Sequence, residues 1–555
     1  MVSEPEVQND NVHSVYWPEG LRIQSRKVYS IDVRAWGAKK TGWSPWSELF
    51  VLETGFWYRH YWTSSLISTP WVEDSKSAPQ PGDLFRKEFK TEGTIRSARL
   101  YGTPQGVHEA EINGLTRGPI KLAEIYDGEK YDATAEVNGW SSPKPVRRLE
   151  TVAPLEVITT PSGKTILDFG QNLVEYVRIK HIKGQRGHQI TLTHAEVPEK
   201  GELRTRPLRD CKAADIYTLR GDSNGESWEP RFSFHGFRYV QLDGWPSSGA
   251  GISEAVEAQM CHTDMEEIGN FFCSDEMVNK LYCNIRRSMR GIFLYVPTDC
   301  PQRDERLGWT GDLALFAPKA TFIYYCFVIL KNWLADVAFD QKMQGGVPPM
   351  VSPNVLLGHK NWGRIGANAI WHYMVVLAPW ALYEETADLT LTILQDQYES
   401  MKTYIDVVPR NKSGLVHLWD FSFTNNPGDM SSFNHYVFCA VTKFLVERLA
   451  GSQRLKPGWK RSRAQPVLGA EYMHASAEHL TPYGRVSCPW KLCGEASGPQ
   501  QLKVDVTVPA LTEMEVVLPT RGGKRVEVVG SGDWSFTTDY ERSYEWPVKE
   551  LSIFP

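Results

Sequence analysis

The 555-residue sequence lacks the segments that mark a secreted or membrane-spanning chain. Its start, MVSEPEVQNDNVHS, has neither the basic stretch nor the apolar stretch of a secretory signal. The longest apolar run extends from Ala320 to Leu330, whereas a membrane span needs about 20 residues. This run therefore predicts a buried helix. We expect a cytoplasmic protein with no membrane partner, or a secreted one if the N-terminus is incomplete.

Several cofactor motifs are also missing. The nine cysteines are scattered without CxxC or Cys/His finger spacing, so we expect reduced thiols and no structural zinc. No GxGxxG, P-loop, HExxH or EF-hand loop occurs, which excludes the usual dinucleotide, nucleotide and zinc-protease sites. We expect no cofactor and no metal site. The 61 basic and 66 acidic side chains leave a net charge of −5, which argues against a nucleic-acid partner.

Aromatic residues, by contrast, are abundant: 20 Trp, 23 Tyr and 22 Phe. Flat aromatic faces can stack on sugars, but they also fill hydrophobic cores. Composition alone leaves both interpretations open. The length corresponds to a prior of about three or four domains.

The hydrophobic pattern changes twice along the chain. Short alternating runs with Gly, Asp and Asn between them cover 28–55, 84–114 and 151–260, and they predict β-sandwich modules and not a parallel α/β sheet. From Asp264 to about 450, apolar residues recur at helical spacing, with helices expected around 312–343, 367–386, 390–407 and 433–450. Strand patterns return from about 465. The predicted order is β-modules, a helical block and a further β-module.

One hydrolase motif is present by sequence alone. Residues Gly221–Gly225 match GxSxG, the nucleophile elbow of α/β-hydrolases, which must lie between a strand and a helix. Here the motif separates DIYTLR from SWEPRF, two strand-like runs. It therefore predicts a hairpin turn instead of a nucleophile.

The segment with the densest group of candidate catalytic side chains is 296–312, VPTDCPQRDERLGWTGD. Charge-rich loops are usually solvated surface, but this one lies between two apolar segments, which should draw part of it inward. Its prolines and glycines predict a loop at the mouth of a helix. Carboxyls, arginines and an indole together suit glycosidic cleavage, which needs an acid for the leaving oxygen and groups that bind the sugar. Burial raises a carboxyl's pKa and a neighbouring arginine lowers it, so these acids could take different roles.

The sequence DCPQRDERLGWTGD resembles the signature of the bacterial-type α-L-rhamnosidases, glycoside hydrolase family 78. The resemblance continues through most of the chain. DFGQNLVEYVRI, HAEVPEKGELRTRPLRDCKAADIYTLRG and WEPRFSFHGFRYVQLDGWP are similar to the β-sandwich before that family's catalytic domain. LFRKEF and the following strands resemble its N-terminal sandwich, PWALYEETAD and SSFNHYVFCAV resemble catalytic-domain helices, and 465–555 resembles its C-terminal sandwich.

The resemblance implies a multidomain fold in which several β-sandwich domains flank an all-α (α/α)6-barrel catalytic domain. The implied domains are a fibronectin-III-like β-module at 1–56, a shortened β-sandwich at 57–150, a β-sandwich at 151–262, the helical catalytic domain at 263–455 and a C-terminal β-sandwich at 456–555. It also implies hydrolysis of terminal α-L-rhamnosides with inversion and without an organic cofactor. The expected partners are small or oligosaccharide rhamnosides.

Site residues follow from the matching motifs. Glu305 corresponds to the general acid. The implied sugar-binding residues are Asp299, Arg303, Trp309, Asp312 and His435. In isolation, a histidine in the context FNHY suggests a core residue, and only the resemblance favours a sugar contact for it.

The sequence departs from the family where the general base is expected. The family has a glutamate in a Glu-Arg-Trp-like segment before SFNHY, but this chain has no glutamate between Glu399 and Glu447. The helical block is also short for the family's barrel, and a second gap is expected around 115–131. Three explanations remain: a wrongly spliced gene model, a rhamnoside-binding protein without activity, or a substitute base, Asp420 or Asp429.

Overall fold

The structure is a computed structural model. It describes residues 22–35, 42–55, 84–90, 146–246, 251–356, 369–387, 436–469, 472–494, 500–520 and 523–541, with short pieces of chain between 63 and 122. The chain divides into two compact units. The first contains Met1–Gly102 and Gly128–Ser142, and the second contains Thr103–Asp127 and Pro143–Pro555.

In the first unit, β1 (Val28–Ile31) pairs with β2 (Phe50–Glu53) in antiparallel register. This agrees with the alternating pattern of 28–55. In the second unit, β3 (Val107–His108) pairs with β6 (Lys121–Leu122), and β4 (Glu111–Ile112) with β5 (Leu115–Thr116). The two N-terminal domains at 1–56 and 57–150, and the gap around 115–131, stay predictions.

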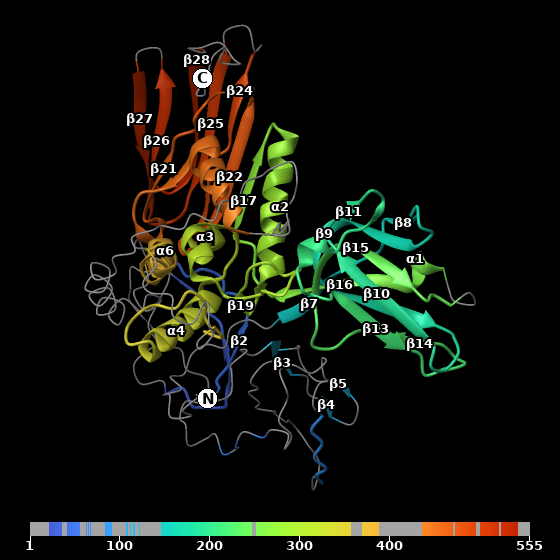
Figure 1. Ribbon diagram of the computed structural model, residues 1–555. Helices are drawn as coiled ribbons and strands as arrows, with labels where there is room; N and C mark the ends of the chain where they lie inside the picture. The colour runs from blue at the N-terminus through green and yellow to red at the C-terminus, as the bar shows by residue number, and fades with distance from the viewer. Residues whose placement is uncertain are drawn as a thin grey trace. The chain divides into compact units, whose positions relative to one another are not determined.

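The strands predicted over 151–260 are present, and residues 146–263 form one eight-stranded antiparallel sheet (Figure 1). The strands are β7 (Val146–Val152), β8 (Glu156–Thr159), β9 (Thr165–Ile182), β10 (Gln189–Ala195), β13 (Ala214–Thr218), β14 (Glu226–Trp228), β15 (His235–Asp243) and β16 (Val256–Thr263). β9 is long enough to pair with β8, β14, β15 and β16. Its buried side chains, among them Leu167 and Val177, share one core with those of β10, β15 and β16.

Three shorter elements complete this region. They are the hairpin of β11 (Pro198–Glu199) and β12 (Glu202–Leu203), the 3-10 turn η2 (Arg206–Leu208) and the short helix α1 (Ile252–Ala255).

The GxSxG match connects two strands, as the sequence predicts, and no helix follows it. Its strands are not partners of one another, however, since β13 pairs with β10 and β14 pairs with β9. The predicted hairpin is therefore a longer connection between two ladders. A turn within it is closed by the Gly225 amide, which donates to the Asp222 carbonyl at 3.0 Å.

The region after 264 is less uniformly helical than its periodicity predicts. β17 (Gly269–Cys273) is a strand that pairs with β22 of the C-terminal sheet. Burial alternates along its residues GNFFC, with Phe271 buried and Phe272 exposed. This alternation is typical of a strand with one buried and one exposed face. The helix α2 (Glu276–Ile292) follows it and contacts it. The Asp275 side chain caps α2 by accepting from two backbone amides.

Ala320–Leu330 is buried as predicted but is not one helix. α3 (Thr310–Ile323) ends inside this run, and three residues separate it from α4 (Phe327–Met343). Within the described residues, no helix is long and apolar enough to cross a membrane. α3 is buried on nearly all sides, as expected for a central helix, and it packs against α6 (Met374–Thr386). α5 (Ala369–His372) precedes α6.

The chain from 436 to 450 continues helically through η5 (Tyr436–Val441), α8 (Thr442–Phe444) and η6 (Leu445–Ala450). The helix expected at 390–407 lies outside the described residues. The number of barrel helices, and with it the expected shortness of the (α/α)6 barrel, therefore stays a prediction.

Two sheets form the C-terminal region, drawn orange to red in Figure 1. The four-stranded sheet contains β20 (Ser452–Arg454), β21 (Arg461–Ala464), β26 (Glu513–Thr520) and β27 (Gly523–Val529). The six-stranded sheet contains β17 with β22 (His474–Thr481), β23 (Gly484–Ser487), β24 (Trp490–Cys493), β25 (Gln500–Val508) and β28 (Gly532–Tyr540). One hydrophobic core extends from α2, α3 and α6 into both sheets. The helices and the C-terminal sheets therefore belong to one compact unit.

Candidate active site

The loop before α3 is held by its own backbone. After β18 (Phe293–Leu294) and β19 (Val296–Pro297), the Asp299 amide donates to the Leu307 carbonyl at 3.0 Å. The Leu307 amide returns a bond to Asp299 Oδ1 at 2.9 Å. The prediction of a loop at the mouth of a helix is confirmed, because the chain becomes helical at Thr310.

Two glycines let other segments approach this loop closely. A Cβ on Gly308 would lie 2.1 Å from the Ser352 carbonyl oxygen, and the Ser352 amide donates to the Gly308 carbonyl at 2.9 Å. A Cβ on Gly236, in β15, would lie 2.8 Å from the Gln302 amide nitrogen. The β-sheet region and the segment after α4 therefore both pack directly against the loop.

Four of the six predicted site residues meet at the Glu305 carboxylate. Arg303 donates to Glu305 Oε2 from Nε at 2.9 Å and from Nη2 at 2.8 Å. The Trp309 indole donates to Glu305 Oε1 at 3.0 Å. The Asp299 carboxyl is hydrogen-bonded to Glu305 and is only 2% exposed. The loop is therefore drawn inward, as expected for a site and not for a solvated surface.

The two remaining predicted residues differ in what the structure says of them. Asp312 lies in the first turn of α3. Its charge helps to raise the pKa of Asp299, and the charge of Glu305 helps to raise the pKa of Asp312. His435 lies outside the described residues, as do Asp420 and Asp429.

Burial and charge separate these acids. Burial, together with the neighbouring Glu305 carboxylate, raises the pKa of Asp299 to about 8. Burial and the same carboxylate raise the pKa of Asp312 to about 7. Burial also acts to raise the pKa of Glu305, but Arg303, the Asp299 hydrogen bond and Arg209 outweigh it, so this pKa lies below its usual value. The surroundings therefore favour the charged form of Glu305 and the neutral form of Asp299.

Two further residues belong to this site. Arg209, from the β-sheet region, places Nη1 3.1 Å from Glu305 Oε2. The Trp371 ring lies beside Trp309 with centroids 6.4 Å apart, and its Nε1 is buried without a hydrogen-bond partner among the described residues. Sequence reasoning missed both. Arg209 is in RTRPLRDC, which carried the family resemblance but no chemical pattern, and Trp371 was one of many tryptophans.

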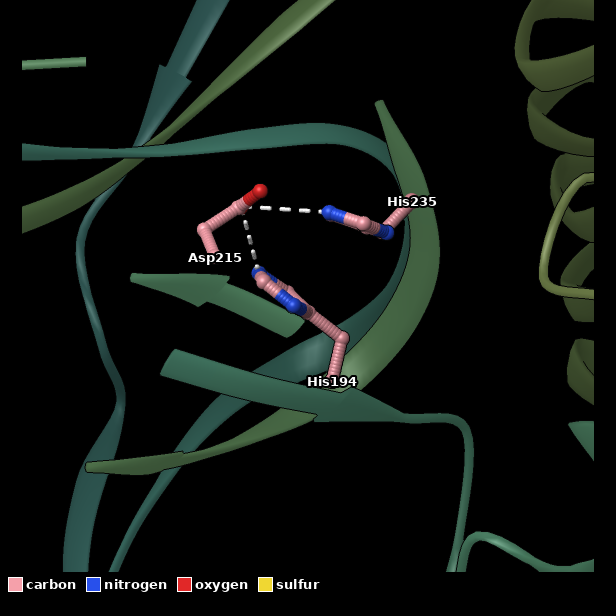
Figure 2. A group of neighbouring side chains, drawn as sticks. All are labelled: His194, Asp215 and His235. Atoms are coloured by element: carbon pink, nitrogen blue, oxygen red, sulfur yellow. Dashed lines mark hydrogen bonds and ion pairs between the residues drawn. The ribbon is translucent and has the colours of Figure 1, made fainter. Parts of the chain in front are cut away.

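A cluster of possible metal ligands lies in the β-sheet region, where His194, Asp215 and His235 converge from β10, β13 and β15 (Figure 2). His235 Nε2 lies 3.1 Å and His194 Nε2 3.8 Å from Asp215 Oδ2. The two imidazoles are stacked, with centroids 4.1 Å apart and an interplanar angle of 21°. An ion between stacked rings would lie outside both ring planes, where the nitrogen lone pairs do not point. The stacked rings therefore do not fit a metal site well. Among the described residues, the His235 Nε2–Asp215 contact is the only hydrogen bond between the three side chains, and His194 Nε2 and His235 Nδ1 are buried without a hydrogen-bond partner.

Asp299, Cys300 and Glu305 also place possible ligand atoms within 4.8 Å of one another. Two arginines already supply positive charge to Glu305 there. A cation would have to compete with both of them.

The comparisons with known proteins agree with this architecture. Three family models match in chain order: the bacterial alpha-L-rhamnosidase concanavalin-like domain at 158–262, the 6 hairpin glycosidase domain at 266–422 and the C-terminal domain at 451–533. Fold and site thus define a multidomain protein of the glycoside hydrolase class. The chain belongs to the bacterial α-L-rhamnosidase family, glycoside hydrolase family 78, as its motifs predict.

Individual relatives show the same likeness. An alpha-L-rhamnosidase from Streptomyces avermitilis is 36% identical over 346 residues, covering 57% of this chain and 32% of that protein. The crystal structure of a rhamnosidase from Aspergillus terreus matches with a TM-score of 0.62 and 30% identity, covering 72% of this chain and 64% of that one. The structure of a Streptomyces avermitilis rhamnosidase complexed with L-rhamnose also matches with a TM-score of 0.62, at 25% identity, covering 71% of this chain and 54% of that one. The chain spans about a third to about half of the length of the curated relatives it matches.

Proposed function

We propose that this chain is an α-L-rhamnosidase, which hydrolyses terminal non-reducing α-L-rhamnose from rhamnosides. The observation that carries the proposal is the Glu305 cluster, in which two carboxyls and an indole meet on a partly buried loop of the region matched to the glycosidase domain. The related structure that contains L-rhamnose supports rhamnosides as the substrate class.

In this proposal Glu305 is the general acid, which protonates the glycosidic oxygen. Asp299, Arg303, Trp309, Asp312 and His435 bind or surround the rhamnose. Carboxyls suit this role because each can accept hydrogen bonds from sugar hydroxyls, and the flat indole face of Trp309 can stack on the ring.

Inversion requires a general base on the opposite side of the sugar, about 6.5–9.5 Å from the acid. Asp299 cannot be that base for Glu305, since their carboxyls are in direct contact and leave no room for the attacking water. The base must come from another segment. The family places it before the SFNHY motif, within residues that the structure does not describe.

The proposed architecture keeps the domain boundaries inferred from the motifs, with one change. The helical catalytic domain at 263–455 contributes β17 to the C-terminal sheet, so the two regions share a strand as well as a core. We propose no cofactor, and we propose a barrel shorter than that of the relatives.

A second candidate function is rhamnoside binding without turnover. It is favoured by the absence of any glutamate between Glu399 and Glu447. Loss of the base would lower the rate by about 10²–10⁴-fold, because positioned proton transfer typically contributes that much. Such a protein would hold the sugar through Asp299, Arg303, Trp309 and Asp312.

Two measurements separate these functions. Release of the aglycone from an aryl α-L-rhamnoside, with β-L-rhamnose as the first anomer seen by NMR, would establish inverting hydrolysis. This aglycone release should be lost in the Glu305→Gln variant. Calorimetry with L-rhamnose tests binding, which Asp312→Ala should abolish. Binding of L-rhamnose without release of the aglycone identifies the second function. If the chain neither binds L-rhamnose nor releases the aglycone, both proposed functions are rejected.

A further inference from the structure

Arg209 reaches the active site from a different part of the chain. It directly follows the 3-10 turn η2, whose residues Pro207 and Leu208 are buried and fix the turn. Its backbone has φ 55° and ψ −127°, a conformation that non-glycine residues disfavour. A residue held in this conformation, with its guanidinium 3.1 Å from Glu305 Oε2, is constrained at both its backbone and its side chain.

Donors surround the Glu305 carboxylate. Oε2 receives Arg303 and Arg209, and Oε1 receives the Trp309 indole. A carboxylate in such surroundings is held in its charged form. Asp299 lies against it, 2% exposed, and its Oδ1 accepts from the Leu307 amide. Two buried carboxyls in contact do not both ionise, so the pair shares one proton.

The two arginines differ in how firmly they are held. The Arg303 side chain is 7% exposed, whereas that of Arg209 is 29% exposed and comes from a separate segment. Arg209 is thus the partner that an incoming leaving group could displace. Among the described residues, the other titratable groups next to the pair are Asp312, which faces it from α3, and the Cys300 thiol near Arg303.

We propose that Arg209 is a positioning residue that decides which carboxyl of the Asp299–Glu305 pair holds their shared proton. While Arg209 contacts Glu305, the proton stays on Asp299. When the leaving group displaces Arg209, the proton passes to Glu305, Asp299 becomes the carboxylate and the total charge of the pair is unchanged. The role of this transfer in catalysis rests on the proposed rhamnosidase function. The contact and the proton position can be tested without turnover.

The first experiment is a double-mutant cycle in the full chain, measured by chemical unfolding at about pH 7. Arg209→Gln should shift the unfolding equilibrium constant about tenfold when Glu305 is present, and less than twofold in a Glu305→Gln background. Arg206→Gln is the matched control, because Arg206 lies in the same turn and its carboxylate neighbour is Glu199 at 3.9 Å. It should have the same effect in both backgrounds. Equal effects of Arg209→Gln in both backgrounds would overturn the proposed contact.

The second experiment locates the proton by infrared spectroscopy at about pH 6, where an ordinary glutamate is ionised. Separate ¹³C labelling of Asp and Glu side chains distinguishes their carboxyl bands. In the wild type, an Asp band that disappears in Asp299→Asn is expected. In Arg209→Gln, a protonated Glu band should appear and be lost in the Arg209→Gln/Glu305→Gln double variant. A protonated Glu305 in the wild type, or none in Arg209→Gln, would refute the proposal.

These readouts stay separate from the proposed function. Failure to cleave or bind rhamnosides would reject the function alone. Additive unfolding effects, or an unmoved proton, would reject the role of Arg209 alone.

Discussion

Replacing Glu385 by Gln should destabilise the helical region strongly, because this carboxylate is fully enclosed by donors. Its side chain is 3% exposed. It accepts from the Trp459 indole and from His479 Nε2, both at 2.5 Å, and it forms an ion pair with Arg454. These contacts join α6 to the C-terminal sheets, so their loss should separate two parts of one core.

The magnitude follows from the charge balance. Burial acts to raise the pKa of Glu385, but Arg454 and His479 outweigh it and lower the pKa to about 2. Against an ordinary value of 4.5, the shift corresponds to about 3 kcal/mol of native-state stability at pH 7. Because the folded pKa is depressed, this contribution is complete above about pH 4.5. It is lost as the pH falls toward 2, so about half or less should remain by pH 3.

Urea unfolding of Glu385→Gln at about pH 7 and pH 3, followed by circular dichroism, tests this. The matched control is Glu384→Gln, since Glu384 pairs with the same Arg454 at 2.9 Å but is 36% exposed. An exposed pair contributes about 0–1 kcal/mol. If both variants lose the same stability, or if the Glu385→Gln deficit is unchanged at low pH, the reasoning is refuted.

Two further changes probe the loop before α3. Asp312→Asn should stabilise the protein by up to about 4 kcal/mol at pH 8 and by much less at pH 5. The reason is that the pKa of Asp312 is raised to about 7 in the folded protein, so the wild type loses stability as the pH rises from about 4 to 7. Unfolding at both pH values measures the difference, and Asp304→Asn, at an exposed acid of the same loop, is the control. Gly308→Ala should lower stability by about 1–3 kcal/mol because its Cβ would overlap the Ser352 carbonyl. A melting temperature within a degree of that of Gly530→Ala, a glycine with open space around it, would contradict this expectation.

The local pattern predicted much of the fold. Alternating runs predicted the strands of 146–263 and the C-terminal strands after about 465, because a strand with one buried face alternates buried and exposed residues along its own sequence. They did not predict β20 and β21, or the parallel pairing of β21 with β26. Prolines and glycines correctly placed a loop before α3. The pattern was wrong at β17, where a five-residue strand between β16 and α2 pairs with residues about 200 positions later.

Along the loop, the sequence by itself determined which chemical groups the site contains, since Asp299, Arg303, Glu305 and Trp309 are close together in one segment. Only the tertiary structure decided their states. Arg209 comes from a distant turn and contacts Glu305, and burial raises the pKa of Asp299. Charge and burial are properties of the assembled neighbourhood, and they depend on contacts between segments that no local pattern records.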